Sequence, residues 1–595
     1  MNDERESTAR QSDLVPSKGD LAVASSGLVR RGLETARKLL SRILHFPAGA
    51  SSGVLYIREP DDQWDMPSDE WQRFADALGN VIVPPGKELR LDVYLTDSQS
   101  LSALAALRPG DLAELRLNGH PVTESDLADL VCLDGLMSLS FSPVGVLNWS
   151  LVEETVLARI GRLSRLKKLD LAWTTTSDNG LMFLVGLTRL GDLSLSGLKV
   201  TGEGLAVLQS TPCLYALDLS YSTIEDDSLK HLAELLWLEK LSIANTEISN
   251  VGLSYLQGST RLRDLDLSRT KITDQGLTIL PKLPDLMNLS MAALPISNGG
   301  MAHVAQLTNL VELSLRGTLI SDGALPHIAN LIWLKSLDLG GTQITSNSLL
   351  NLKNLSGLTS LGLSNTQIDD AALVHLASLT SLKSLDLEQT RITDTGLQHL
   401  GHLPDLSWVD LAETGVTASG ILRFPEKSFL AVNLSIEQIT KDEFSELRER
   451  RSNWLFSFGD EMGNYDRAVD QKADTYHILG QLKLEEGDLD GAIIKFSKVL
   501  SMKPDHVGAH NGLGMVLMEK GDLDGAIGTY REAIRIDPKA PEPYYNLGIV
   551  LRRVGRQVEA VWAIKEFLRL AENAHSTRVW IDRAQTILVE LEKER

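Results

Sequence analysis

Aspartate is the residue whose type and spacing could do chemistry in this 595-residue chain, because it recurs at a fixed interval. One set of aspartates stands before glycine in motifs such as TDQG, which begins at Thr273. Such residues resemble calcium ligands, but a calcium loop needs a denser cluster of carboxylates. They are better explained as first-turn helix residues, whose negative charge the helix dipole favours. We therefore expect no metal site and no cofactor.

No catalytic constellation accompanies these acids. The sequence lacks the motifs GxxxxGK[ST], HExxH, CxxC and GxSxG, which mark phosphate, zinc, redox and nucleophile chemistry. Its histidines are scattered, and Cys132 and Cys213 lie in hydrophobic runs, where buried apolar thiols are expected. The sequence therefore predicts a protein that is not an enzyme.

A second set of aspartates predicts a binding surface. Each stands between two leucines of an LxxLxL segment and, because side chains alternate along a strand, points away from the buried leucines. Residues 91–470 hold 28 Lys and Arg against 46 Asp and Glu, so most of the net charge of −21 lies here. A basic or polar partner would fit this face, although the acids could also merely solvate the sheet. The set comprises Asp170, Asp218, Asp266, Asp338, Asp386 and Asp410.

Aromatic and basic residues near the same segments complete the candidate surface. Trp173, Tyr221 and Trp408 are expected at its rim, where exposed Trp and Tyr are favoured interface anchors. Packing against the longer unit before Leu166 is the alternative for Trp173. Arg269 and Arg316 either orient an acidic group of the partner or pair with Asp266 and Glu312. Nucleic acid is not an expected partner, because phosphate binding needs a basic stripe.

A repeat must position all these side chains. The leucine that opens each unit recurs every 24 residues, from Leu166 to Leu406, and LRDLDLSRTKITDQGLTILPKL at residues 262–283 is one complete unit. LxxLxL predicts a strand, and GLxxLxxL predicts a short helix with one apolar face. Such units bury their apolar faces only by stacking. A Thr column, such as Thr270, is expected to bond the turn of the neighbouring unit, and the following Ser or Thr column, such as Thr273, is expected to cap the helix.

This pattern resembles the leucine-rich-repeat family over residues 88–448. The resemblance implies an α/β solenoid of horseshoe type, with a parallel sheet on its concave side and helices outside. It also implies protein binding on the concave sheet, without indicating a particular partner.

A second repeat with a period of 34 residues follows a predicted linker, residues 449–472. Gly480, Gly514 and Gly548 align in the first helix of each unit, and Ala492, Ala526 and Ala560 align in the second. Small residues let two helices approach, and the aligned large residues fill the gap between them. The pattern resembles three tetratricopeptide repeats over residues 473–574, with a capping helix at 575–595. The resemblance implies an all-α superhelix with a peptide-binding groove.

The groove residues favour an amphipathic peptide. One version of the family grips peptide carboxylates with Lys, Asn and Arg, but the matching positions here include His477, Gln481, Gly512 and Glu542, so that clamp is missing. Met side chains adapt to apolar ligands. The candidate groove residues are His477, Gln481, Asn511, Met515, Met518, Tyr545 and Asn546.

The N-terminal region predicts a disordered tail at 1–27, an amphipathic basic helix at 28–47 and a small mixed cap at 48–87. Within the cap, residues 53–57 and 80–84 read as strands and residues 68–78 as a helix. No signal peptide or membrane span is evident, so a cytoplasmic location is expected. The sequence favours a scaffold with two concave binding surfaces. The alternatives are an exported bacterial effector or regulatory subunit of a protein-modifying complex, and a sensor tethered to a membrane surface through residues 28–46.

Overall fold

The computed structural model describes residues 42–48, 51–59, 71–94, 104, 107–119, 135–142, 151–425, 427, 429–459, 461–462, 465–571 and 578–593. The chain forms two compact units. The first comprises residues 1–383 and 402–405, and the second comprises residues 384–401 and 406–595. The expected tail at 1–27 and the expected basic helix as far as residue 41 lie outside the described residues.

A small β cap precedes the repeats of the first unit. Its strands are β1 (Arg42–His45), β2 (Val54–Arg58), β3 (Gln72–Asp76) and β4 (Asn80–Val83). β1 pairs with β4, and β2 pairs with both β3 and β5, all in antiparallel fashion. The helical prediction is therefore wrong for residues 42–45 and 72–76, because strand pairing across the cap outweighs the local helical pattern.

A parallel ladder of strands forms the body of the first unit. Neighbouring strands from β8 onward are in register at a step of 24 residues, so Leu217 lies beside Leu241 and Leu241 beside Leu265. The strands are β5 (Glu88–Tyr94), β6 (Glu114–Asn118), β7 (Ser138–Ser142), β8 (Lys168–Asp170), β9 (Asp192–Ser194), β10 (Ala216–Asp218), β11 (Lys240–Ser242), β12 (Asp264–Asp266), β13 (Asn288–Ser290), β14 (Glu312–Ser314), β15 (Ser336–Asp338) and β16 (Ser360–Gly362).

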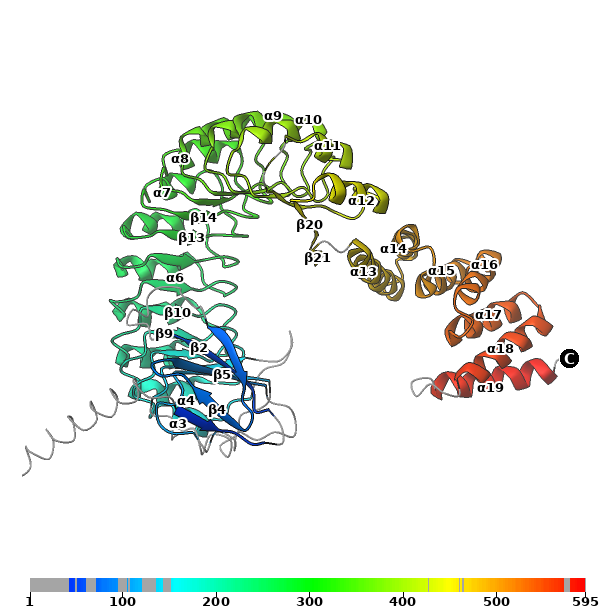
Figure 1. Cartoon of the computed structure of the whole chain (residues 1–595), viewed down its shortest axis with the longest axis horizontal. Helices are drawn as coiled ribbons and strands as arrows, with labels where there is room; N and C mark the ends of the chain where they lie inside the picture. Colours follow the sequence, from blue (N-terminus) through cyan, green and yellow to red (C-terminus); the bar gives the residue numbers. More distant parts are fainter. Residues whose placement is uncertain are drawn as a thin grey trace, which may run out of the picture. The chain divides into compact units, whose positions relative to one another are not determined.

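Short α-helices and 3-10 helices (η) connect these strands and lie on the other side of the ladder, as Figure 1 shows for α6, α7 and α8. Their brevity follows from the repeat, which leaves few residues between one strand and the next. They are α3 (Glu154–Ile160), α4 (Asp178–Leu181), η3 (Met182–Gly186), α5 (Gly202–Leu205), η4 (Ala206–Ser210), η5 (Asp226–Glu234), α6 (Asn250–Ser254), η6 (Tyr255–Gly258), η7 (Gly276–Lys282), α7 (Met301–Val304), η8 (Asp322–Ala324), α8 (Leu325–Ile328), η9 (Ser346–Asn354), α9 (Asp370–His375) and η10 (Leu376–Ser378).

Leucine side chains fill the space between the strands and the helices. The opening leucines from Leu166 to Leu406 are each at most 2% exposed. Burial of apolar surface at this density is the main force that holds the stacked units together. Cys213 differs from its expected state, because it lies exposed in the turn before Leu214. Cys132 lies outside the described residues.

The threonine column closes its own turn rather than the turn of the neighbouring unit, so the predicted partner was wrong. The Thr270 hydroxyl donates to the Leu267 carbonyl at 2.8 Å, and the Thr342 hydroxyl donates to the Leu339 carbonyl at 2.6 Å. In both pairs the acceptor lies three residues earlier in the same unit. These buried hydroxyls therefore satisfy a turn carbonyl locally and leave the contact between units to other groups.

Neighbouring units are joined by the acid of the TDxG motif, a role that the sequence interpretation missed. Asp322 accepts the Thr345 backbone N–H at 2.7 Å and the Thr345 hydroxyl at 2.6 Å, and Asp226 does the same with Ser249 at 2.7 and 2.6 Å. The bonded hydroxyl residue begins the helix of the next unit. We call this pair of bonds the Asp lock. Charge-assisted bonds of this kind are stronger than neutral ones.

The glycine of TDxG makes room for the Asp lock. A Cβ atom on Gly252 would lie 2.5 Å from Asp226 Oδ1, and one on Gly420 would lie 2.1 Å from Asp394 Oδ1. Any larger side chain would therefore displace the carboxylate that joins the two units. The expected helix caps are also present in part, since Ser249 and Thr393 accept a backbone N–H, whereas Ser321 makes no such bond.

The second unit contains the last leucine-rich strands and short helices. β17, β18 and β19 are parallel, and β20 extends them from residues predicted as linker. The linker at 449–472 is therefore wrong as drawn, because Phe456 and Phe458 bury their rings beside Phe444 and so complete the sheet. The elements are β17 (Ser384–Asp386), α10 (Asp394–Leu397), η11 (Gln398–His402), β18 (Trp408–Asp410), α11 (Ala418–Arg423), β19 (Ala431–Asn433), α12 (Lys441–Arg450), β20 (Leu455–Phe458) and β21 (Glu461–Met462).

Stacked pairs of helices complete the second unit. The predicted approach of small residues is observed: a Cβ atom on Gly514 would lie 2.5 Å from the Tyr530 ring, and one on Gly480 would lie 2.7 Å from the Phe496 ring. No helix in the described part of the chain is long and apolar enough to cross a membrane. The helices are α13 (Tyr465–Glu485), α14 (Leu489–Met502), α15 (Val507–Lys520), α16 (Leu523–Ile536), α17 (Pro541–Arg553), α18 (Gln557–Ala571) and α19 (Arg578–Lys593).

Candidate functional site

The strand face that points away from the leucine core is the candidate binding surface of the repeat array. In each three-residue strand the middle leucine is buried, and the residues on either side of it point to the opposite face. The third strand position holds the predicted aspartates. Asp266 accepts the Ser268 backbone N–H at 3.0 Å, and Asp338 accepts the Gly340 N–H at 2.9 Å. These carboxylates thus shape the turn as well as charging the surface.

The same bond recurs at each predicted aspartate. Asp170 and Asp218 accept the N–H two residues later, as do Asp386 and Asp410 in the second unit. Burial raises the pKa of the Asp410 carboxyl above its ordinary value, although N–H donation from Ala412 and Asn433 acts the other way. Purely solvating acids would not need a fixed partner, so part of this column has a structural role.

A depression of about 440 Å³ lies on this face between β9 and β15. Six of its lining residues are acids, and Lys240 is its one base. Lys240 lies 3.1 Å from Asp264, so its charge is already compensated within the wall. The depression therefore presents net negative charge from the acids Asp192, Asp218, Asp264, Asp266, Glu312 and Asp338.

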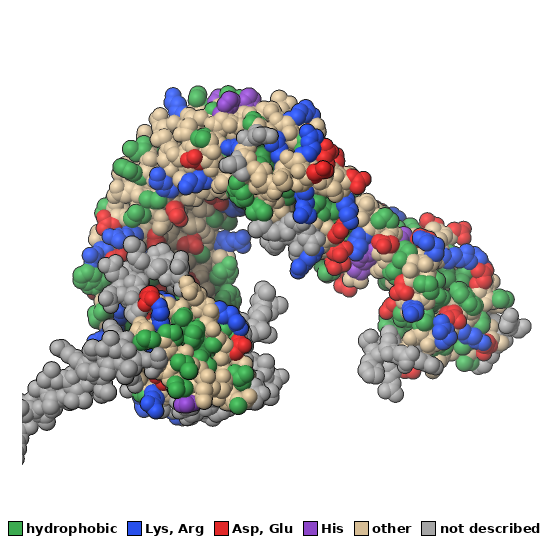
Figure 2. All heavy atoms as spheres, in the orientation of Figure 1, with side chains coloured by type: hydrophobic (Ala, Val, Ile, Leu, Met, Phe, Trp, Pro, Cys, Tyr) green, Lys and Arg blue, Asp and Glu red, His purple; other side chains and the backbone are tan. Residues whose placement is uncertain are grey.

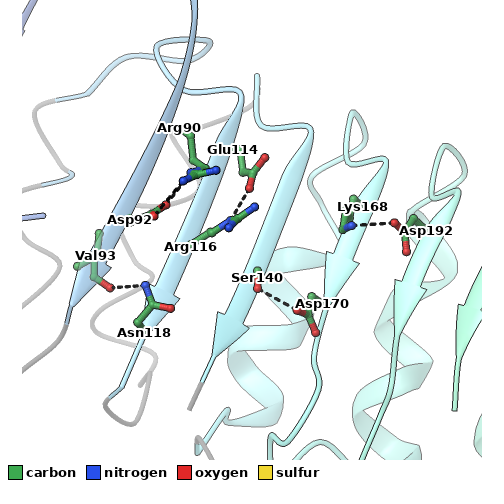
Figure 3. A network of polar contacts seen from close by, with 10 residues as sticks. All are labelled: Arg90, Asp92, Val93, Glu114, Arg116, Asn118, Ser140, Lys168, Asp170 and Asp192. Atoms are coloured by element: carbon green, nitrogen blue, oxygen red, sulfur yellow. Dashed lines mark hydrogen bonds and ion pairs between the residues drawn. The ribbon is translucent and has the colours of Figure 1, made fainter. Parts of the chain in front are cut away.

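A second, more mixed depression of about 350 Å³ lies on the first strands of the ladder (Figure 3). Arg116 Nε lies 2.6 Å from Glu114 Oε1, and Lys168 Nζ lies 3.0 Å from Asp192 Oδ2. Both pairs bring residues of opposite charge together on the exposed strand face. Its lining residues are Asp92, Glu114, Arg116, Asn118, Ser138, Ser140, Lys168 and Asp170.

Protonation states in this mixed depression follow from its burial and its ion pairs. Burial alone would lower the pKa of Lys168, but the ion pair and hydrogen bond with Asp192 raise it above its ordinary value. Burial raises the pKa of the Asp170 carboxyl, while donation from the Ala172 amide and the Ser140 hydroxyl opposes the rise. Lys168 is therefore a fixed positive charge near neutral pH.

The sequence interpretation did not identify the mixed depression. Strand pairing places Asp92 beside Arg116, and Arg116 beside Ser140, in the same column that continues to Asp170. The signal that could have found them was the column itself, extended back into the degenerate units at Glu88 and Leu112. Their irregular spacing hid that alignment until the strand register was known.

The predicted rim aromatics form a pair. The Trp173 and Tyr221 rings lie 5.5 Å apart, and the Trp173 ring packs over Gly197, the matching residue of the unit between them. Both residues have a φ of 57°, in the left-handed region. Their backbone N–H groups donate to Ser196 and Ala244, so this conformation is imposed by the turn of the repeat. Trp408 lies elsewhere, in strand β18, and is half-buried.

The two predicted arginines differ. Arg316 Nη1 donates to the Ser364 hydroxyl at 2.8 Å and lies 3.8 Å from Asp338, rather than pairing with Glu312. Arg269 is exposed, and no ion pair joins it to Asp266 within the described ranges. Among the residues that the structure describes, no three His, Cys, Asp or Glu side chains are grouped so that they could hold a metal ion.

The structure brings some of the predicted groove residues of α13, α15 and α17 together. Asn546 Nδ2 donates to Asn511 Oδ1 at 3.0 Å, which joins two successive repeats. Met515 and Met518 are half-buried against the core of the second repeat, and Gln481 is exposed. Tyr545 packs between Phe567 and Trp580, with ring centroids 5.1 and 5.2 Å away.

His477 lies in an apolar pocket that faces His506. Their ring centroids are 5.0 Å apart, and the buried His477 Nδ1 has no hydrogen-bond partner. Burial lowers the pKa of His477, and His506 lowers it further. His477 is therefore neutral near pH 7, and its assignment to a ligand groove stays a prediction.

Comparison with family models identifies both repeat types. A leucine-rich-repeat model matches residues 258–278 and 378–401. A tetratricopeptide-repeat model matches residues 473–506, and a TPR-repeat model matches residues 514–555. No curated protein matches the chain.

Solved structures resemble each region separately. An internalin (InlF) from Listeria monocytogenes is 24% identical, covering 53% of this chain and 90% of that chain with a TM-score of 0.39. The type III secretion chaperone SycD of Yersinia enterocolitica, in complex with a peptide of the translocator YopD, is 19% identical, covering 20% and 92% with a TM-score of 0.20. The TPR2B domain of yeast Sti1 is 14% identical, covering 21% and 99% with a TM-score of 0.20.

Proposed function

Because the chain contains leucine-rich repeats in its middle and tetratricopeptide repeats at its C-terminal end, we propose that it is a non-enzymatic scaffold with two separate binding surfaces. Both repeat classes generally bind proteins and are typically non-catalytic. Solenoids of this kind present extended surfaces that suit protein or peptide ligands. One surface would hold one partner while the other raises the effective concentration of a second.

The charge of the 440 Å³ depression is the observation that carries this proposal. Six carboxylates against one paired lysine favour a basic or polar protein segment, because complementary charge speeds encounter and disfavours acidic competitors. Asp218, Asp266 and Asp338 are held by their own turns, so they would meet the ligand without first losing side-chain freedom.

The tetratricopeptide groove supports a second, chemically different ligand. Met515 and Met518 offer adaptable apolar contacts, and the bonded pair Asn511 and Asn546 offers polar ones. An amphipathic peptide would use both kinds of contact. The two surfaces thus differ in the partner that each would accept, which is what a bridging scaffold requires.

The test compares partners captured from the native host by the full-length chain and by two surface variants. Glu312→Lys with Ser314→Lys adds positive charge to the depression, and Gln481→Arg with Glu542→Arg adds bulk and charge to the groove. All four residues lie on described surfaces outside the leucine core. Mass spectrometry would identify the bound proteins, and circular dichroism would verify that each variant is folded.

A scaffold predicts that each variant loses a different protein that the unchanged chain retains. Loss of the same protein from both variants would show a single partner that spans both surfaces, and would overturn the bridging role. Unchanged capture by both variants would overturn the assignment of these two surfaces.

A further inference from the structure

The first helix of the tetratricopeptide region has an exposed apolar face. Ile478, Leu479 and Leu482 of α13 are 56%, 37% and 48% exposed, and Thr475 lies one helical turn before Ile478. In Figure 2, hydrophobic side chains lie among acidic and basic ones on the tetratricopeptide helices. We call Thr475, Ile478, Leu479 and Leu482 the α13 face.

The same positions are covered in the next two repeats. Leu482 corresponds, at the 34-residue period, to Val516 and Val550, which are both 0% exposed. Leu479 corresponds to Leu513, which packs against the core of the first repeat, and to Leu547, which is 1% exposed. The α13 face therefore exposes what the later repeats bury.

The element that covers these positions is the second helix of the preceding repeat. Phe496 and Val499 of α14 share a core with Ala509 and Val516 of α15. A Cβ atom on Gly512 would lie 2.5 Å from the Phe496 ring, which shows how closely the two helices approach. In α14 the buried apolar residues Ala492, Phe496 and Val499 follow the spacing i, i+4 and i+7. The repeat thus defines the shape of the ligand that would fit α13.

The charged residues beside the α13 face indicate the polarity of that ligand. Glu485 and Glu486 lie exposed one helical turn beyond Leu482. Lys483 Nζ compensates Glu486 at 2.8 Å, whereas Glu485 makes no ion pair within the part of the chain that the structure describes. A covering helix with basic residues beside its apolar stripe would therefore complement this edge.

We propose that the α13 face docks an amphipathic helix of a partner protein, with apolar residues at i, i+4 and i+7 and basic residues beside them. The site is distinct from the concave groove and from the acidic depression, so it adds a third binding surface to the proposed scaffold. The partner helix would occupy the position that α14 occupies on α15 and that α16 occupies on α17. Such helix-in-groove docking draws its affinity from apolar anchors.

A helix-stabilised peptide with the α14 sequence, LDGAIIKFSKVLSM, is the probe, because α14 covers the equivalent positions of α15. Its binding to the full-length chain would be measured by fluorescence anisotropy. We expect micromolar affinity, and we expect Leu482→Glu to weaken binding about tenfold or more. Ile494→Glu is the matched control, because Ile494 is 64% exposed on α14 and lies outside the α13 face, so binding should stay within about twofold.

The remaining outcomes decide against the proposal. Equal binding to wild type and to Leu482→Glu would place the peptide elsewhere, and no binding at about millimolar peptide would show that the face takes no such helix. Sedimentation would detect the competing occupant, a second copy of this chain. A dimer that Leu482→Glu dissociates would make the α13 face a self-interface and overturn the partner helix.

Discussion

The leucine-rich units and the tetratricopeptide units stack by different means. Between leucine-rich units, buried leucines are joined by Asp locks such as the one from Asp322 to Thr345. Between tetratricopeptide helices, small residues lie against large ones, as Gly512 does against Phe496. The first region satisfies polar groups at every step, whereas the second relies on apolar packing and leaves the α13 face open. The comparison teaches that the tetratricopeptide stack is more sensitive to the loss of single side chains.

The largest effect is expected from Phe496→Ala. Removal of this fully buried ring, around which the core of the first tetratricopeptide repeat packs, should cost about 3–5 kcal/mol of unfolding free energy. Only three repeats share that loss, so calorimetry should show a lower transition for the helical region while the array transition stays in place. Leu313→Ala, at a 2%-exposed leucine, is the counterpart and should lower the other transition. A common shift of both transitions by either change would contradict the contrast.

Loss of an Asp lock is expected to have the next largest effect. Asp322→Ala removes two bonds to Thr345 and should cost about 1.5–3 kcal/mol, measured by denaturant unfolding. Asp285→Ala is the control, because Asp285 is exposed and lies outside any lock. An equal cost for both changes would show that the lock adds nothing beyond surface charge.

The same lock should make stability depend on pH. Burial acts to raise the pKa of Asp322, but hydrogen bonds from Thr345 and Ser348 outweigh it and lower the pKa below its ordinary value. The folded state then binds the proton less tightly than the unfolded state, so the contribution is complete above about pH 4 and is lost as pH falls through the lowered pKa. Asp322→Ala should narrow the difference in stability between pH 7 and pH 3.

Tyr530→Phe should act in the opposite direction in the helical region. The Tyr530 hydroxyl is buried without a hydrogen-bond partner, and burial raises its pKa far above the ordinary range. Because a buried, unpaired polar group is costly, its removal should raise stability by about 1 kcal/mol, measured as the unfolding midpoint of the helical transition. A loss of stability would show that the hydroxyl is satisfied in solution.

A reciprocal pair of changes tests the left-handed turn position of the array. Gly317 has a φ of +68° and open space around a Cβ atom, whereas Ala293 holds the same position one unit earlier with a φ of 54°. Gly317→Ala should cost about 1 kcal/mol and Ala293→Gly should recover a similar amount, because left-handed backbone strains residues that carry a Cβ atom. Chemical denaturation would measure both, and changes of the same sign would contradict the strain argument.

The smallest effect on stability is expected from Glu312→Lys. Glu312 lies exposed on the depression, so its replacement should change stability by less than about 0.5 kcal/mol. Binding of a lysine- and arginine-rich peptide should nevertheless weaken, and added salt should weaken it further for the unchanged chain. Titration at two salt concentrations would measure this, with Lys335→Glu as a charge-changing control outside the depression. Peptide affinity that is insensitive to both salt and Glu312 would rule out electrostatic recognition there.

The fold class was predictable because the repeats state it many times. The 24-residue and 34-residue periods each specify a unit that can bury its apolar face only against a copy of itself, and the parallel sheet and the helix pairs are confirmed. The cap was less predictable, since residues 42–45 and 72–76 carry a helical pattern without repetition and are held as strands by partners far along the chain. The end of the array was misjudged for the same reason, because β20 joins β19 without the leucine pattern.

The candidate site was predictable as a column of residues but not as a set of contacts. The strand alternation placed Asp170, Asp218 and Asp266 on the exposed face, as observed. It could not show that each aspartate also accepts a bond from its own turn, nor that Trp173 reaches Tyr221 across an intervening glycine. Such contacts depend on φ angles and on side-chain directions that a linear pattern does not contain.

The sequence by itself determined that this protein stacks two kinds of repeat and carries its excess negative charge on the first. It could do so because leucine, glycine and aspartate recur at intervals that match a strand, a turn or a helix. Only the tertiary structure decided which groups meet: it joined Asp322 to Thr345, set Lys168 beside Asp192, and left Leu482 exposed where Val516 is buried. The physical reason is that hydrogen bonds and packing act over a few ångströms between residues that are 23 or more positions apart in the chain.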